Sequence, residues 1–194
     1  KHPIAMKASD WSWYLMALSM GDPMFDGDLE PVFANPGSKA REAMKMLLEF
    51  FREELISPEI VAGTVNQHSI FWSGVGTFHQ GWQGSIRVGN NADKSKQAPN
   101  VAYMVLPEVG STWSFPAAIG IARYSKNLDA SWKFIRWYTG IENQKAIYNA
   151  FGLYPSRASV ADDLNRQGAV DGYPEILAQA AKVNELPRYT LWWG

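Results

Sequence analysis

The sequence predicts an α/β fold in which a mixed sheet is flanked by helices. Apolar side chains recur at helical spacing in several stretches, and short apolar runs typical of strands lie between them. Glycine and proline mark most of the boundaries. The chain has 194 residues, 46% of them hydrophobic, which is enough for one large domain or two small ones. We find no internal repeat.

Two helices are predicted in the first third of the chain. Asp10 is the expected N-cap of a short aromatic helix, which stops at the Gly-Asp-Pro sequence of residues 21–23. Asn35 is expected to cap, and Pro36 to open, a long helix that ends near Ser57. One face of this helix is apolar and carries Ala40, Ala43, Met44, Leu47, Leu48, Phe51 and Leu55.

The middle of the chain contains the predicted strands. A short strand is expected at 75–78, after which glycine admits a helix that begins near Trp82. Further strands are predicted at 101–107 and 117–122. Ligands of open α/β sheets bind at the carboxyl ends of strands. Trp82, at a strand-to-helix junction, is therefore a candidate for ligand contact.

The last third of the chain is mainly helical. Residues 125–127, Ser-Lys-Asn, are expected to cap a helix whose apolar stripe lies within 128–138. A second helix is predicted over 142–151, and a third over 173–183. The stretch 152–160 between them is predicted to be extended.

Composition and charge exclude several classes of function. The net charge is −1 and the basic residues are scattered, so we expect neither nucleic acid nor an anionic membrane as a partner. The apolar runs are broken before they reach about 18 residues, so no membrane span is expected. Cysteine is absent, which excludes disulfides and thiolate chemistry. The chain opens on Lys1 without a signal sequence, so we expect any export signal to be removed or to lie outside this segment.

The motifs of metal, nucleotide and nucleophilic sites are missing. The three histidines, His2, His68 and His79, do not have the spacing of a metal site, so we expect neither metal nor cofactor. The acidic stretch 22–30 lacks the spacing of a calcium loop. There is no G-x-S-x-G, no dinucleotide fingerprint and no P-loop. A pair of catalytic carboxylates stays open, because distances between carboxylates cannot be read from sequence.

Tryptophan is the main functional signal. The chain has nine tryptophans, several of them at predicted ends of elements. An indole can cover the apolar C–H face of a sugar ring while amides and carboxylates bind its hydroxyls. Removing 60–80 Å² of apolar surface from water would contribute roughly 1.5–2 kcal/mol per stacked ring. Packing in the core is the alternative for each of these tryptophans, which are Trp11, Trp13, Trp82, Trp113, Trp192 and Trp193.

The order of three stretches resembles a known family. They are MGDPMFDGDLEPVFANPGSKAREAMKMLLEFF (20–51), GVGTFHQGWQGS (74–85) and AAIGIARYSKNLDASWKFIRWYTGIENQKAIYNAFGLYPSRASV (117–160). The chain is similar, from Trp11 to Trp193, to the extracellular solute-binding proteins (family 1) of sugar ABC transporters, which include maltose- and trehalose-binding proteins. The most specific part of the likeness is the last stretch.

The resemblance implies a periplasmic-binding-protein type II-like lobe. Members have two α/β lobes that close about a hinge, and a full member is about twice this length, so the chain is expected to be a fragment that covers mostly the C-terminal lobe. Residues 1–117 would form the second (C-terminal) lobe. Residues 118–168 would form the hinge-crossing strand and the helices that belong to the first lobe, with Gly120 as a hinge candidate. Residues 169–194 would return to the second lobe.

The resemblance also implies a function without catalysis. The chain would be the carbohydrate-binding component of an ABC importer, which captures a mono- or oligosaccharide between the lobes and presents it to a membrane permease. We expect a periplasmic or extracellular monomer, held at the membrane by the permease or by a lipid anchor outside this fragment. The alternatives are a hydrolase with an Asp/Glu pair and a receptor for a non-sugar solute. By position, the expected ligand-binding residues are Trp82, Trp193, Trp192, Trp113, Trp11 and Asp10.

Overall fold

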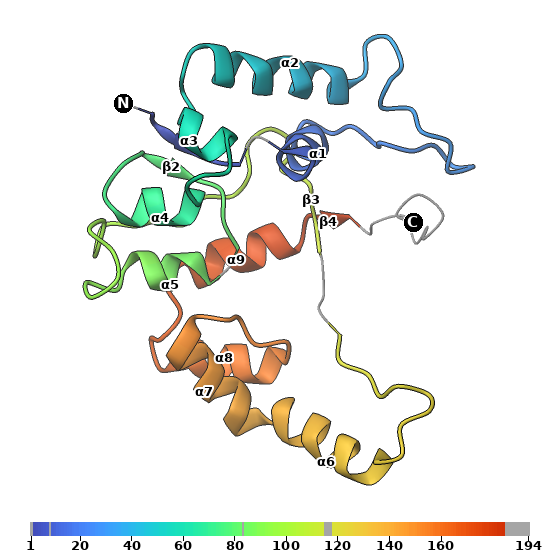
Figure 1. Ribbon diagram of the computed structural model, residues 1–194, viewed down its shortest axis with the longest axis vertical. Coiled ribbons are helices and arrows are strands. Elements are labelled where there is room, and N and C mark those ends of the chain that lie inside the picture. The colour runs from blue at the N-terminus through green and yellow to red at the C-terminus, as the bar shows by residue number, and fades with distance from the viewer. Residues whose placement is uncertain (1, 8, 83, 115–117, 185–194) are drawn as a thin grey trace.

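The computed structural model describes residues 2–7, 9–82, 84–114 and 118–184. Helices dominate these segments, and four short strands form two separate pairs (Figure 1). In chain order the elements are β1 (Ile4–Ala5), α1 (Asp10–Ser19), α2 (Lys39–Arg52), α3 (Pro58–Val61), α4 (Gln67–Trp72), β2 (Phe78–His79), α5 (Ser85–Gly89), β3 (Thr112–Trp113), α6 (Leu128–Tyr138), α7 (Ile141–Phe151), α8 (Ala158–Arg166), α9 (Tyr173–Ala180) and β4 (Val183–Asn184).

Both strand pairs are parallel. β1 pairs with β2, and β3 pairs with β4. Ile56 forms a further parallel bridge to Ile4, so β1 lies between two neighbouring segments, and an isolated antiparallel bridge joins Phe25 to Pro31. Because parallel partners need long crossovers, each pair joins residues more than 70 positions apart in the chain. These pairs bring the end of β2 and the start of β3 close to helices from elsewhere in the sequence.

The packing of α1 on α2 forms the first apolar core. Its buried members are Ala17, Leu18, Met24, Ala40 and Ala43. Two polar contacts reinforce it. The indole Nε1 of Trp13 donates to the carbonyl of Ala40 at 2.7 Å, and the buried carboxylate of Asp22 accepts from the backbone N–H groups of Met24 and Ala40, both at 2.8 Å. Asp22 thus satisfies one donor of the first turn of α2, the N–H of Ala40, which has no partner inside the helix.

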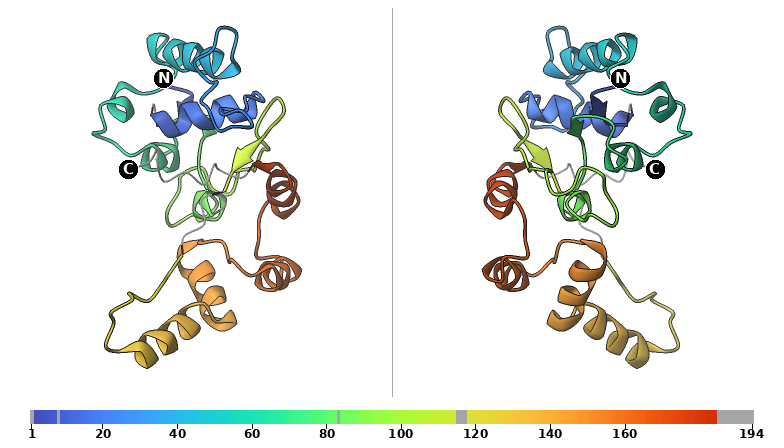
Figure 2. Two further views of the ribbon diagram at one scale, coloured as in Figure 1. Left: turned by 90° about the vertical axis from the view of Figure 1, so that its right-hand side faces the viewer. Right: turned by 90° about the vertical axis from the view of Figure 1, so that its left-hand side faces the viewer.

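A second core joins α7, α8 and α9. Its buried residues are Tyr148, Val160, Leu164, Val170 and Ile176. Helices α6, α7 and α8 lie at the end of the molecule opposite α2, and an extended stretch before α6 leads to them (Figures 1 and 2). α6 itself buries none of its residues within the described structure.

The predicted α/β class is confirmed, but two of the predicted strands are wrong. Residues 101–107 and 118–122 form no ladder within the described segments. Side-chain amides take the place of a neighbouring strand in the first of them: Asn90 bonds both the N–H and the C=O of Val101, and Gln179 accepts from the N–H of Leu106 at 2.8 Å. Residue 117 lies outside the described residues.

Several predicted helix boundaries also differ. α2 begins at Lys39 because Ser38, and not Asn35, is its N-cap and accepts from the N–H of Arg41. Ser9 precedes α1 as its N-cap, so Asp10 is the first helical residue. α5 begins at Ser85, three residues after Trp82.

The remaining C-terminal predictions are largely correct. Asn127 is the N-cap of α6, and α7 agrees with the predicted 142–151 within one residue. α9 ends three residues before the predicted position. The prediction of an extended 152–160 is wrong from Ala158 onward, because α8 begins there and buries Val160 and Leu164. No helix among the described residues is long and apolar enough to cross a bilayer.

Candidate functional site

Trp82 lies just beyond the end of β2 and is 42% exposed. The glycines beside it are required by close packing. A Cβ on Gly81 would lie 2.5 Å from Ser85 Oγ and 2.7 Å from His79 Cε1. A Cβ on Gly84 would collide with the carbonyl of Gly152 and lie 3.1 Å from the indole nitrogen of Trp82. The turn is therefore held tightly against its surroundings, and it carries an aromatic side chain that stays partly open to solvent.

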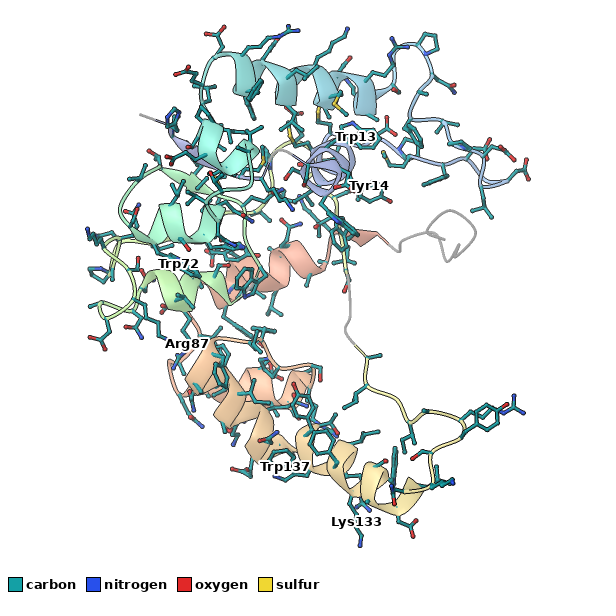
Figure 3. All side chains as sticks on the ribbon, in the orientation of Figure 1. Trp13, Tyr14, Trp72, Arg87, Lys133 and Trp137 are labelled. Atoms are coloured by element: carbon teal, nitrogen blue, oxygen red, sulfur yellow. The ribbon has the colours of Figure 1, made fainter. Side chains whose placement is uncertain are left out.

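A cluster of imidazole and aromatic rings surrounds the buried side of this turn, and we call it the His68 cluster. It consists of His68, Phe71, Trp72, His79 and Trp82. The ring of His68 meets that of Trp82 edge to face, with centroids 4.4 Å apart, and is stacked on that of Trp72 at 5.8 Å. The ring of His79 is stacked on that of Phe71 at 4.8 Å. Figure 3 shows Trp72 on α4.

The two histidines are hydrogen-bonded to each other. His68 Nδ1 and His79 Nε2 are 2.7 Å apart. Burial lowers the pKa of His68, while burial and the charge of His68 lower the pKa of His79 to about 4. Both rings are consequently neutral at physiological pH. Among the described residues, no group of three or more His, Cys, Asp or Glu side chains is placed to hold a metal ion.

The first turn of α1 lies beside this turn. Ser12 Oγ donates to the carbonyl of Lys7 and lies 2.7 Å from the side-chain amide of Gln80, which connects α1 to the segment just before Trp82. Trp11, the neighbour of Ser12, is 38% exposed, and its ring lies against that of Trp113 with centroids 4.8 Å apart and planes tilted by 32°. Asp10 is exposed, and its carboxylate accepts from the N–H of Trp11.

The structure thus brings together some of the predicted site residues. Trp11, Trp113 and Asp10 form one group at the start of α1, and Trp82 is connected to that group through Gln80 and Ser12. Trp13, in contrast, belongs to the core between α1 and α2. Trp192 and Trp193 lie outside the described residues. Gly120 lies in the exposed stretch before α6.

Sequence reasoning missed the His68 cluster. His68 and His79 are 11 residues apart in sequence and do not share a helical or strand period, so their contact depends on α4 packing against β2. The only sequence signal was the density of histidine and aromatic residues between 68 and 82.

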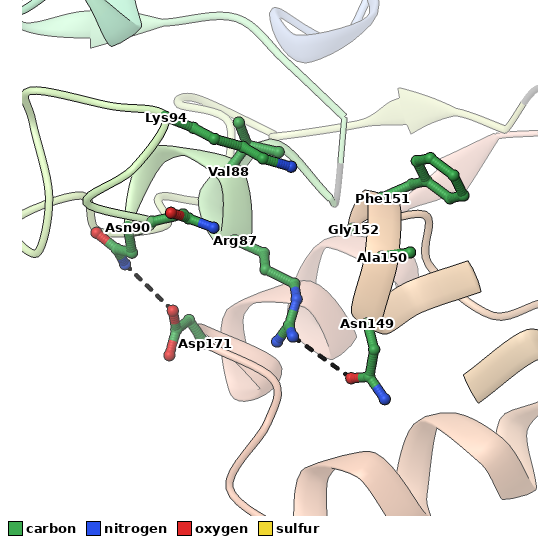
Figure 4. A pocket seen from close by; sticks show the side chains of 10 residues that line it. Arg87, Val88, Asn90, Lys94, Asn149, Ala150, Phe151, Gly152 and Asp171 are labelled. Atoms are coloured by element: carbon green, nitrogen blue, oxygen red, sulfur yellow. Dashed lines mark hydrogen bonds between the residues drawn. The ribbon is translucent and has the colours of Figure 1, made fainter. Parts of the chain in front are cut away.

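A pocket of about 240 Å³ lies between α5 and the C-terminal end of α7 (Figure 4). Arg87 donates to Asn149 Oδ1 and to the carbonyl of Ala169, and its guanidinium lies over the ring of Tyr148. Asn90 donates to Asp171 across the pocket lining. Because these groups are engaged with one another, we assign no ligand to this pocket.

The comparisons with known proteins show the family and the fold of the chain. A family model described as bacterial extracellular solute-binding protein matches residues 1–176. Among solved structures, the fold is similar to that of a maltose-bound MalE3 from T. maritima, with a TM-score of 0.76 and 21% sequence identity. That match covers 99% of this chain and 50% of MalE3, so the chain spans about half the length of that protein. Because the family model covers most of the sequence, the chain belongs to the bacterial extracellular solute-binding protein family.

Proposed function

We propose that the chain is the sugar-contacting part of a solute receptor for an ABC importer, and that Trp82 is its principal stacking surface. The exposed indole at the end of β2 is the observation that carries this proposal. Membership in the solute-binding family supports it, as does the fold that the chain shares with MalE3, whose structure contains maltose. The solute is bound and released unchanged.

Other residues near Trp82 supply the complementary groups. The Trp11–Trp113 pair offers a second apolar surface, and Asp10 offers a carboxylate for sugar hydroxyls. The side-chain amide of Gln80 is bonded to Ser12 Oγ through one of its two polar atoms. The other polar atom has no partner among the described residues and is available to a sugar hydroxyl. Trp192 and Trp193 remain proposed contacts.

The lobe arrangement is part of the same proposal. Residues 1–117 belong to the second lobe, 118–168 cross to the first, and 169–194 return, with Gly120 at the hinge. The separation of α6 from α1 and α2 in Figure 1 supports this division for α6, whereas α7 and α8 share a core with α9. The receptor is monomeric, acts outside the cytoplasmic membrane, and delivers its solute to a permease. A lipid anchor outside this segment, or the permease itself, keeps it at the membrane.

The substitution Trp82→Ala tests the proposal in the full-length receptor that carries this chain. A panel of mono- and oligosaccharides should raise the melting temperature of the unchanged protein, because ligand binds only the folded state. Trp82→Ala should then weaken binding of the best sugar by about ten- to thirty-fold, the loss expected for one stacked ring. Isothermal titration calorimetry measures the affinity.

Trp132→Ala is the matched control, since Trp132 is also a half-exposed tryptophan but lies on α6. It should leave sugar affinity unchanged. A lower melting temperature with unaltered affinity in Trp82→Ala would show that Trp82 belongs to the core. Release of reducing ends from an oligosaccharide at a catalytic rate would instead support a hydrolase.

A further inference from the structure

His68 is the central ring of the His68 cluster. Its imidazole contacts three other rings, with centroid distances of 4.4 Å to Trp82, 4.8 Å to His79 and 5.8 Å to Trp72. Its backbone N–H donates to the N-cap Asn66 at 2.8 Å, which fixes the start of α4. The backbone that carries the ring is therefore fixed, and the ring touches the exposed indole of Trp82 from the buried side of the turn.

The hydrogen bonds of His68 define one arrangement of protons. Gln67 Nε2 lies 3.2 Å from His68 Nε2, and an amide nitrogen can only donate, so His68 Nε2 accepts. The proton of neutral His68 is then on Nδ1 and is donated to His79 Nε2 at 2.7 Å. Both ring nitrogens of His68 have a partner, and the ring cannot turn without losing both bonds.

We infer that His68 is the positioning residue for Trp82: held by Gln67, His79 and Trp72, its ring fixes the indole in the orientation in which it meets a solute. The inference rests on the proposed role of Trp82. It adds that affinity depends on a residue that does not itself touch the sugar. The physical reason is preorganisation, because an indole that is already fixed loses less side-chain entropy on binding.

Few ionisable groups surround this pair. β1 contributes Ile4 and Ala5, and β2 contributes Phe78 and His79, so His79 is the titratable side chain that these strands present to α4. Lys96 reaches the end of α4 through its backbone N–H, which donates to the carbonyl of Trp72. Burial lowers the pKa of both histidines. Acidification to about pH 4 therefore places positive charge on this pair.

The fluorescence of Trp82 provides a test that needs no solute. Its contribution is the difference in emission between the unchanged protein and Trp82→Phe. A protonated imidazole quenches an adjacent indole, so this contribution should fall between pH 7 and pH 4. In His68→Gln it should lose most of this pH dependence, and acrylamide should quench Trp82 more readily at pH 7. His2→Gln, which changes a histidine outside the cluster, should behave like the unchanged protein.

The same pH profile and the same acrylamide quenching in His68→Gln and the unchanged protein would overturn the inference. Circular dichroism checks that each variant is folded. If His68→Gln does not fold, His79→Leu serves instead, since leucine has no acceptor for the Nδ1–H of His68 while His68 itself remains. It should increase acrylamide quenching of Trp82 in the same direction, and unchanged quenching would again overturn the inference.

A double-mutant cycle tests the consequence for binding, with maltose as the probe. His68→Gln should raise the Kd at pH 7 by about three- to ten-fold. In the Trp82→Ala background the same change should have no further effect, because a residue that acts through Trp82 is then redundant. Additive losses would overturn the inference. If Trp82→Ala leaves the Kd unchanged, the sugar-stacking proposal fails, while the fluorescence test still decides whether His68 positions Trp82.

Discussion

α2 and α6 are both amphipathic in sequence, yet the structure buries only one of them. α2 buries Ala40, Ala43 and Leu47 against neighbouring segments, and Leu47 is 7% exposed. α6 buries no residue within the described structure, and Leu128 at its start is 56% exposed. An amphipathic pattern thus specifies a helix and the face that needs covering, but not the surface that covers it.

The aromatic residues of α6 contact one another instead of a core. The ring of Phe134 is stacked on that of Tyr138 at 5.9 Å and lies 5.7 Å from that of Trp137. Figure 3 shows Trp137 and Lys133 on this helix, at the opposite end of the molecule from α2. Under the proposed lobe arrangement, this face packs on the first lobe of the receptor.

A pair of matched leucine substitutions tests most directly whether α2 is buried and α6 is not. Leu47→Ala should reduce the free energy of unfolding by about 2–5 kcal/mol, because it leaves a cavity in a packed core. Leu128→Ala should change it by less than about 0.5 kcal/mol in the 194-residue chain. Urea denaturation measures both values. A loss of similar size at Leu128 would show that α6 is covered.

The His68 cluster and the helix α8 also differ in their response to acid. The pKa of His79 is about 4 in the folded chain and near 6.5 when unfolded, so folding favours the neutral ring. The stability that depends on this is complete above pH 6.5 and is lost progressively as the pH falls to about 4. We expect a loss of about 1–3 kcal/mol over that window, allowing for partial exposure. Urea denaturation at several pH values measures it, and His79→Gln should flatten most of the slope.

The ion pair of Asp163 on α8 responds at lower pH than His79 does. Asp163 forms an ion pair with Lys145 at 2.6 Å, and its hydrogen bond and charge interaction with Lys145 hold the pKa of this partly exposed carboxyl below 3.8. A folded pKa below the unfolded one gives stability that is present above about 3.8 and is lost as the pH falls further. If Asp163→Asn, and not His79→Gln, removed the loss between pH 6.5 and 4, the assignment to His79 would be wrong.

Local signals in the sequence were sufficient for the longer helices. The stripes of α1, α2, α6 and α7 and the Asn127 cap depend on neighbours within one or two turns, so they could be predicted. The predicted strands at 101–107 and 117–122 could not be assessed in that way, because a strand exists only if another segment supplies its ladder. Asn90 and Gln179 supply hydrogen bonds to the first of these segments from distant positions.

The candidate site was predictable in part for the same reason. Trp82 was singled out by its flanking glycines, and the structure shows that both positions lack room for a side chain. The pairing of Trp11 with Trp113 and of His68 with His79 depends on how α1, β3, α4 and β2 pack together. Such contacts between distant segments leave no period in the sequence.

The smallest change in stability is expected at Gly120, which has more space around it than the glycines of the Trp82 turn have. A Cβ on Gly120 would meet nothing within 4 Å, whereas a Cβ on Gly81 would lie 2.5 Å from Ser85 Oγ. Gly120→Ala should therefore stabilise the chain slightly, by about 0.4–1 kcal/mol, since it restricts only the unfolded state, while Gly81→Ala should destabilise it. Urea denaturation measures both changes in the free energy of unfolding.

If Gly120 is the hinge, stopped-flow measurement of maltose binding in the full-length receptor should also show slower closure for Gly120→Ala. An unchanged closure rate would place the hinge at another residue of the crossing segment.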